Sequence, residues 1–190
     1  MSNERDLVRE LNELRRDPKA YSFKLNKYKD YFEGNILKIP GAPAGIQTKE
    51  GPAAYDEAIQ FLQTAKPADE MIPSKGLFYI ASDFLAMVQK ETDPNNLKDV
   101  DMDSIISRHG SFVGNFSRSM EFGGATPEQV IINLVVGDGD SSRGQREALL
   151  NGDLKKVGVA SGKHDTYRTA SIIVGCTQFN NNSGNDDYSI

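Results

Sequence analysis

The spacing of the apolar residues changes along the chain, and this change restricts the folds that are open to it. In the first two thirds of the chain, apolar residues recur every three or four positions, as on one face of a helix. After Lys156, two runs rich in β-branched residues are typical of strands. Helices that come first and strands that come late favour an α+β layered domain over alternating βαβ units. The spacing predicts helices over 7–17, 21–28, 52–65, 74–88 and 126–136, a short helix within 142–150, and strands over 156–160 and 170–177.

The segment 130–136 could form either a helix or a buried strand, because it is rich in valine and isoleucine. A capping signal precedes it. Thr126 can cap a helix, Pro127 suits the first helical position, and Gln129 completes a capping box. We therefore predict a helix that ends at Gly137.

The length of 190 residues suits one domain, at roughly 100–200 residues per domain. We expect a single domain over 1–179 and a disordered tail over 180–190, because that tail begins with a polar run. Residues 34–51 read as a long loop. Long ordered loops usually have a function. We expect this loop to contact a lipid or a partner through Ile36, Leu37, Ile39 and Ile46.

The net charge of −5 excludes several classes of partner. A pI near 5.1 argues against a nucleic-acid-binding protein and against a polybasic membrane anchor. No apolar run approaches the roughly 18 residues that a transmembrane helix needs. The charged N-terminus lacks the apolar core of a signal peptide. We expect a cytoplasmic protein, or a secreted one if a leader peptide has been removed.

Sulfur and imidazole ligands for a metal are scarce, since the chain has one cysteine, Cys176, and two histidines, His109 and His164. An intrachain disulfide and a cysteine-rich zinc site are excluded. Cys176 lies among apolar residues, which predicts a buried, inert thiol. The acidic runs 99–103 and 138–142 resemble calcium loops, but both lack the glycine and glutamate that an EF-hand requires, which favours solvated turns.

Several motifs follow one another between Arg108 and Tyr167, and their order is more specific than any one of them. An N-terminal helix with the sequence 11–18 and the segment 50–59 precede them. The motifs are His109-Gly110-Ser111, Asp138-Gly139, Arg143-Gly144-Gln145-Arg146, Val157-Gly158-Val159-Ala160, His164 and Tyr167. Over residues 7–179 this order resembles the CAP superfamily, which includes cysteine-rich secretory proteins, antigen 5 and plant pathogenesis-related proteins. It is most similar to the cysteine-poor branch of microbes and protists.

The resemblance implies a three-layer α-β-α sandwich with a cleft that two histidines and two acidic residues line. Two neutral imidazoles would suit zinc or copper. By this resemblance the cleft of the present chain contains His109, Glu121, Asp138 and Gln145. Gln145 stands where the family has its second histidine, and glutamine is neither a general base nor a good zinc ligand.

The remaining polar candidates have simpler interpretations. Arg143 and Arg146 could bind an anion, but we expect them to pair with nearby acids such as Asp138, Asp140 or Glu147. We expect His164 to lie in a loop at the end of a strand and to hydrogen-bond the backbone.

We therefore expect a non-catalytic binding protein for a lipid, a sterol or a protein partner, with a degenerate cleft and no cofactor. One alternative is a metal-assisted hydrolase or protease that uses His109 and Glu121, the only candidates for a divalent metal site. A second alternative is a calcium-linked partner-binding protein that uses the acidic runs.

Overall fold

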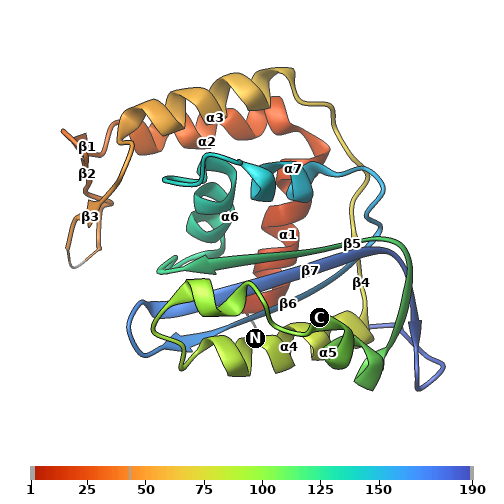
Figure 1. The fold of residues 1–190 in the computed structure, drawn as a ribbon. Coiled ribbons are helices and arrows are strands. Elements are labelled where there is room, and N and C mark those ends of the chain that lie inside the picture. The colour runs from red at the N-terminus through yellow and green to blue at the C-terminus, as the bar shows by residue number, and fades with distance from the viewer. Residues whose placement is uncertain (1–2, 43, 189–190) are drawn as a thin grey trace.

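The computed structural model describes residues 3–42 and 44–188, which form three layers with a four-stranded sheet in the middle (Figure 1). The strand order is β4-β6-β7-β5. Strand β4 pairs with β6 in parallel, and the other pairs are antiparallel. The strands are β4 (Ile72–Pro73), β5 (Gly110–Phe122), β6 (Lys156–His164) and β7 (Arg168–Asn181). The predicted α+β class and its α-β-α layering are confirmed.

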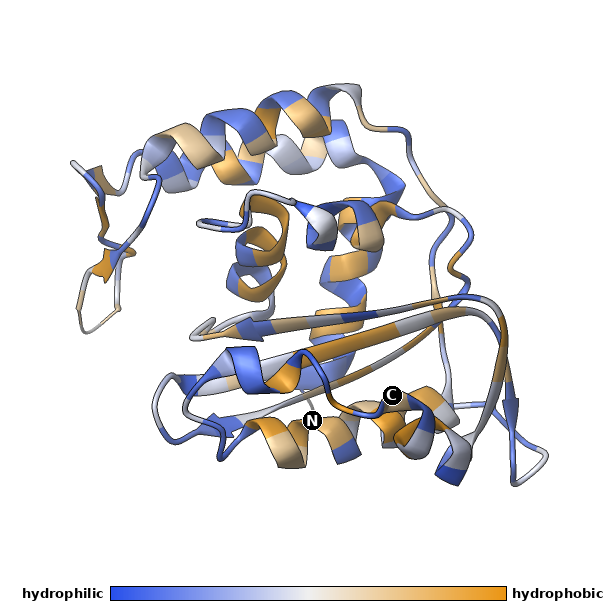
Figure 2. Cartoon of the chain, in the orientation of Figure 1, coloured by the Kyte–Doolittle hydropathy of each residue, from blue (hydrophilic) through white to orange (hydrophobic). Residues whose placement is uncertain are grey.

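Five helices lie on one side of the sheet (Figure 1). They are α1 (Asn3–Arg16), α2 (Pro18–Lys29), α3 (Pro52–Thr64), α6 (Pro127–Val136) and α7 (Gly144–Leu150). Their buried side chains form one cluster with Val157, Val159 and Ile173 of the sheet. Helix α6 is apolar nearly all round and sits between the sheet and the α2–α3 pair (Figure 2). Thr126 accepts a hydrogen bond from the Gln129 N–H, so the predicted cap is confirmed.

The opposite face carries α4 (Lys75–Val88) and α5 (Met102–His109), with the short 3₁₀-helix η1 (Pro94–Leu97) beside them. Because side chains alternate along a strand, Ile172, Val174 and Cys176 of β7 point into this second cluster. Cys176 is fully buried, as expected, and burial raises the pKa of its thiol to about 12. Helix α4 packs directly on Gly158 of β6, where a Cβ atom would lie 2.1 Å from the Leu77 carbonyl carbon.

Several segments differ from their sequence-based expectation, and helix α5 is not among the helices that the sequence predicts. Two strands of a small antiparallel sheet, β2 (Ile36–Leu37) and β3 (Ile46–Gln47), lie within the segment expected as a loop over 34–51, and the third, β1 (Phe32–Glu33), lies just before it. Strand β5, the 13-residue edge strand, was not expected at all. The strands β6 and β7 are longer than expected, so that His164 is the last residue of β6 instead of lying in a loop.

The C-terminal segment, expected to be disordered from residue 180, lies against α4 through residue 188. Strand β7 continues to Asn181. The Asp186 carboxylate accepts hydrogen bonds from the Ser74 hydroxyl and the Gly76 N–H at the start of α4. The Tyr188 ring stacks on Phe78. A carboxylate at a helix N-terminus satisfies free backbone donors, which explains why a polar segment is held here.

In the described part of the chain, no helix is both long enough and apolar enough to cross a membrane.

Candidate functional site

A cleft of about 530 Å³ opens between the small sheet β1–β3, helix α6, the end of β5 and the turn that joins β6 to β7. One part of its wall is apolar, with Leu37, Ile39, Ile46, Tyr55, Met120, Phe122, Leu134, Val136 and Tyr167. Its polar lining includes Thr48, Glu121, Gln129, Asn133, Asp138, Asp140, Gln145, Thr166 and Arg168. Three of the four residues predicted for a cleft, Glu121, Asp138 and Gln145, therefore line the same cavity.

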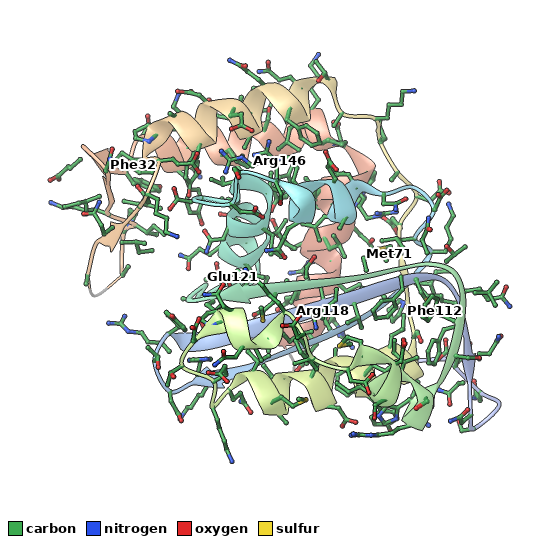
Figure 3. The ribbon with its side chains drawn as sticks, viewed as in Figure 1. Phe32, Met71, Phe112, Arg118, Glu121 and Arg146 are labelled. Carbon is green, nitrogen blue, oxygen red and sulfur yellow. The ribbon has the colours of Figure 1, made fainter. Side chains whose placement is uncertain are left out.

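Glu121 lies on β5 at the floor of the cleft and is only 5 % exposed (Figure 3). Its Oε1 accepts hydrogen bonds from the Asn133 amide at 2.8 Å and from the Gly124 N–H at 3.0 Å. Burial raises the pKa of Glu121 to about 7, although these two hydrogen bonds favour the ionised form. Burial therefore favours the neutral, protonated carboxyl group at pH values at which an exposed glutamate is ionised.

Gln145 lies at the start of α7 and uses its whole side-chain amide on one residue of β5. Its Oε1 accepts from the Met120 N–H at 3.1 Å, and its Nε2 donates to the Met120 carbonyl at 3.3 Å. The amide thus pairs with the edge of the sheet as a neighbouring strand would. The Gln145 side chain is therefore a structural link between α7 and β5.

Asp138 follows α6 and fixes the segment that leads from β3 to α3. Its two carboxylate oxygens accept hydrogen bonds from the Lys49 and Glu50 N–H groups, both at 2.8 Å. In return, the Glu50 carboxylate accepts from the Gly139 N–H and from the Arg143 guanidinium. The hydrogen bond from Arg143 is the main reason that the pKa of Glu50 falls to about 2. These contacts hold the mouth of the cleft in place.

The two arginines of the Arg-Gly-Gln-Arg motif pair with acids that are distant in sequence, and not with the acids expected. Arg143 pairs with Glu50 and Glu57 at 2.9 and 2.8 Å, and Arg146 pairs with Glu57 at 3.0 Å. Arg146 is buried in the helical layer (Figure 3) and also donates to the carbonyls of Val135 and Val136. The expected partners next to the motif in sequence, Asp138, Asp140 and Glu147, form no ion pair with either arginine in the structure as described. Both guanidinium groups are therefore structural.

His109 does not line the cleft. It ends α5 just before β5 begins, whereas Glu121 lies near the other end of that 13-residue strand. The His109 Nε2 atom lies 2.9 Å from the Asp83 carboxylate, and its ring stacks on Tyr79 of α4. The structure therefore does not bring together the pair His109 and Glu121 that a metal-assisted hydrolase would need.

His164 is the last residue of β6 and not part of a loop, but its imidazole bonds to the backbone as the sequence indicated. Its Nδ1 accepts from the Thr166 and Tyr167 N–H groups at 3.0 and 3.1 Å. Its ring packs edge-on against Phe122 at 5.2 Å between centroids. These contacts shape the turn over 164–168, part of which forms a wall of the cleft.

The donor set of the cleft does not fit a metal ion. Over residues 3–42 and 44–188, no three His, Cys, Asp or Glu side chains are grouped so that they could hold one. In the acidic runs, Asp101 accepts from the Ser104 N–H, and Asp140 accepts from the Ser142 N–H and hydroxyl. The chemistry that the cleft does offer is apolar contact together with hydrogen bonding by a carboxyl group that is neutral in part.

Sequence reasoning missed several residues of the cleft, among them Met120, Phe122 and Asn133. A signal for the first two exists, since Phe116, Met120 and Phe122 alternate with polar residues as in a half-buried strand. For Asn133 the signal is a single polar side chain within the apolar helix α6. Such a residue usually has a buried hydrogen-bond partner, here Glu121.

Comparisons with known proteins give one structural neighbour. No family model matches the chain, and no curated protein matches it. Among solved structures, a cysteine-rich secretory protein from Staphylococcus aureus subsp. aureus Mu50 aligns with a TM-score of 0.41 and 14% sequence identity. The alignment covers 66% of this chain and 38% of that chain. The chain spans well under half of the length of that protein.

Proposed function

We propose that this protein is a CAP-like binding protein that holds a lipid or sterol in the cleft and performs no chemistry on it. The observation that carries the proposal is Glu121, a buried carboxyl group of raised pKa in a largely apolar cavity. A neutral carboxyl group can donate a hydrogen bond to a hydroxyl or carbonyl oxygen. Apolar walls with a few polar groups are typical of sites for small ligands, and 530 Å³ lies within their usual range of roughly 300–1,000 Å³.

The small sheet β1–β3 supports the same function. Leu37 of this sheet is buried, whereas Ile36 and Ile46 are 38 % and 45 % exposed. Ile46 and Ile39 also line the cleft. The segment therefore presents apolar side chains at the cleft mouth, where the hydrophobic part of an amphipathic ligand would enter and lose contact with water.

The test is a titration of the protein with a fluorescent sterol and, separately, with a fluorescent fatty acid. In the variant Thr166→Trp a large ring would fill the mouth, because Thr166 is an exposed residue of the cleft lining. Asp165→Trp is the matched control, since Asp165 is the exposed neighbour outside the lining. We expect the first variant to lower the affinity for the bound probe at least tenfold and the control to leave it unchanged.

Comparison of the two probes also shows whether the cleft prefers a neutral hydroxyl or a carboxylate head group on its ligand. A neutral sterol should bind more tightly at pH 6 than at pH 8, because ionised Glu121 cannot donate a hydrogen bond. Glu121→Gln should remove this difference, since its amide donates at both pH values. The proposal is wrong if neither probe binds, or if both tryptophan variants bind as the wild type does.

A further inference from the structure

Strand β5 has an unpaired edge. Among the described residues, the strand order β4-β6-β7-β5 leaves one side of this 13-residue strand without a neighbouring strand. Natural proteins usually shorten, cover or charge such an edge, because its free N–H and C=O groups can pair with another chain. An edge of this length that is left partly open therefore needs an explanation.

Two hydrogen bonds show which main-chain N–H and C=O groups of β5 point away from β7. Met120 bonds with the Gln145 amide, so its N–H and C=O point away from β7. Gly123 donates to the Thr169 carbonyl of β7. Every second residue before Gly123 therefore also directs its main-chain N–H and C=O groups toward β7. Since main-chain groups alternate along an antiparallel strand, Phe116 and Arg118 point outward like Met120. Within the described residues the outward main-chain groups of these two have no hydrogen-bond partner, and both side chains are partly buried.

Gln145 shows that this edge can pair with an amide group. Its two hydrogen bonds to Met120 reproduce the two that a residue of a neighbouring strand would make. The amide occupies the edge only at Met120. The adjoining stretch 116–118 offers the same geometry to an amide from outside the chain.

The surroundings of the Arg118 side chain, which Figure 3 labels, indicate the charge of a peptide that would bind at this edge. Its guanidinium lies over the Phe84 ring, 4.6 Å from the centroid, and donates to the Leu97 carbonyl at 3.3 Å. Its Nη1 atom is buried and has no hydrogen-bond partner among the described residues. No carboxylate of the described chain forms an ion pair with it. An acidic side chain on a paired strand would lie beside Arg118 and balance its unpaired positive charge.

We propose that the outer edge of β5 over Phe116–Arg118 binds an extended peptide of a partner protein, with an acidic residue beside Arg118. A second copy of the chain fits less well. Elements on both sides of the sheet reach this edge, because Gln145 of α7 bonds Met120 from one side and the Leu97 carbonyl accepts a hydrogen bond from Arg118 on the other. A single extended segment is narrower than a second domain, whose own flanking helices would have to pass these contacts. Addition of a strand to an open edge is an established mode of peptide recognition.

The test uses three labelled peptides and fluorescence anisotropy with the full chain. The first is Thr-Val-Glu-Val-Thr-Val, the second has glutamine for glutamate, and the third carries N-methyl groups on alternate residues. We expect the acidic peptide to bind at least tenfold more tightly than the glutamine peptide, and the N-methylated peptide not to bind. Amide hydrogen exchange should slow at Phe116 and Arg118 when the acidic peptide is present.

Two substitutions of Arg118 separate the contribution of its charge from that of its main-chain hydrogen bond. Arg118→Ala should make the glutamate and glutamine peptides bind equally. Arg118→Pro also removes the outward N–H without removing a bond to β7, so it should abolish binding of both peptides. Thr166→Trp, which blocks the cleft, should leave peptide binding unchanged, so failure of this proposal and failure of the lipid proposal are distinguishable.

The proposal is overturned if the acidic peptide does not bind at millimolar concentration, or if it binds without protecting Phe116 and Arg118. It is equally overturned if those amides become protected with rising protein concentration alone while sedimentation shows a dimer, because the occupant would then be a second copy. If Arg118→Pro fails to fold, hydrogen exchange of the wild-type chain decides the matter.

Discussion

At the scale of single residues, Glu121 carries the largest electrostatic cost that we identify in the cleft. Its carboxyl group is ionised in the unfolded chain above pH of about 4.3, but burial raises its pKa in the folded chain to about 7. The folded state therefore binds this proton more tightly than the unfolded state does. Its contribution to stability is complete below the unfolded pKa and is lost as the pH rises through the folded one.

This linkage predicts the behaviour of Glu121→Gln. The amide keeps the acceptor for the Asn133 side chain but cannot ionise. Urea unfolding should give equal stability for wild type and variant near pH 4.5. At pH 8 the variant should be more stable by about 3 kcal/mol, the free energy of a shift of between two and three pKa units. A difference between the two proteins that is the same at both pH values would contradict the buried, neutral state of Glu121.

The residue types alone do not show which arginine forms an ion pair with which carboxylate. The Arg143 and Arg146 side chains reach Glu50 and Glu57, which lie 86 to 93 positions earlier in the chain. Acids close to the arginines in sequence were the natural expectation, because only the packing of α3 against α6 brings the distant ones near. His109 is a second example. Its motif is visible in the sequence, but its distance from the cleft depends on the start and direction of β5, which the sequence does not show.

At the scale of elements, six of the seven α-helices of the described residues were predictable, whereas α5 and the edge strand β5 were not. The helix α6 has a capping signal and an apolar stripe, which agree with each other. In β5, the alternation is interrupted by a register shift between Val113 and Phe116. The row of alternate β5 side chains that is otherwise apolar also contains a charged residue, Arg118. Such a strand shows neither a clean period of two nor a continuous apolar run, so its pattern does not stand out.

The contact of α4 with β6 gives a prediction at the element scale. Gly158→Ala should destabilise the protein by about 3 kcal/mol or more, because the new methyl group would overlap the backbone of α4 at Leu77. Gly152→Ala is the matched control, since a Cβ at Gly152 meets no atom within 4 Å. Thermal and urea unfolding of both variants measure the difference. If the two substitutions cost the same free energy, close packing of α4 on Gly158 is not what fixes that glycine.

At the scale of the whole molecule, the small sheet β1–β3 is an appendage to the three-layer body. Figure 1 shows it projecting from the end of the α2–α3 pair. Its buried anchor is Leu37, and its return to α3 is held by Asp138 through the Lys49 and Glu50 N–H groups. The sandwich does not need this segment for its sheet or for its second core cluster, whereas the cleft needs it for one wall.

Replacement of residues 34–45 by a short glycine–serine linker should therefore separate folding from binding. The loss of Leu37 burial should cost roughly 2–3 kcal/mol, and the circular dichroism of the three-layer body should remain. Affinity for the fluorescent probe that the wild type binds should fall at least tenfold, because the wall with Ile39 and Ile46 is removed or displaced. Ile46→Gln, which changes this wall alone, should weaken binding in the same direction. Unchanged affinity in the replacement variant would place the ligand outside this cleft, since no cavity with one wall missing could hold it equally well.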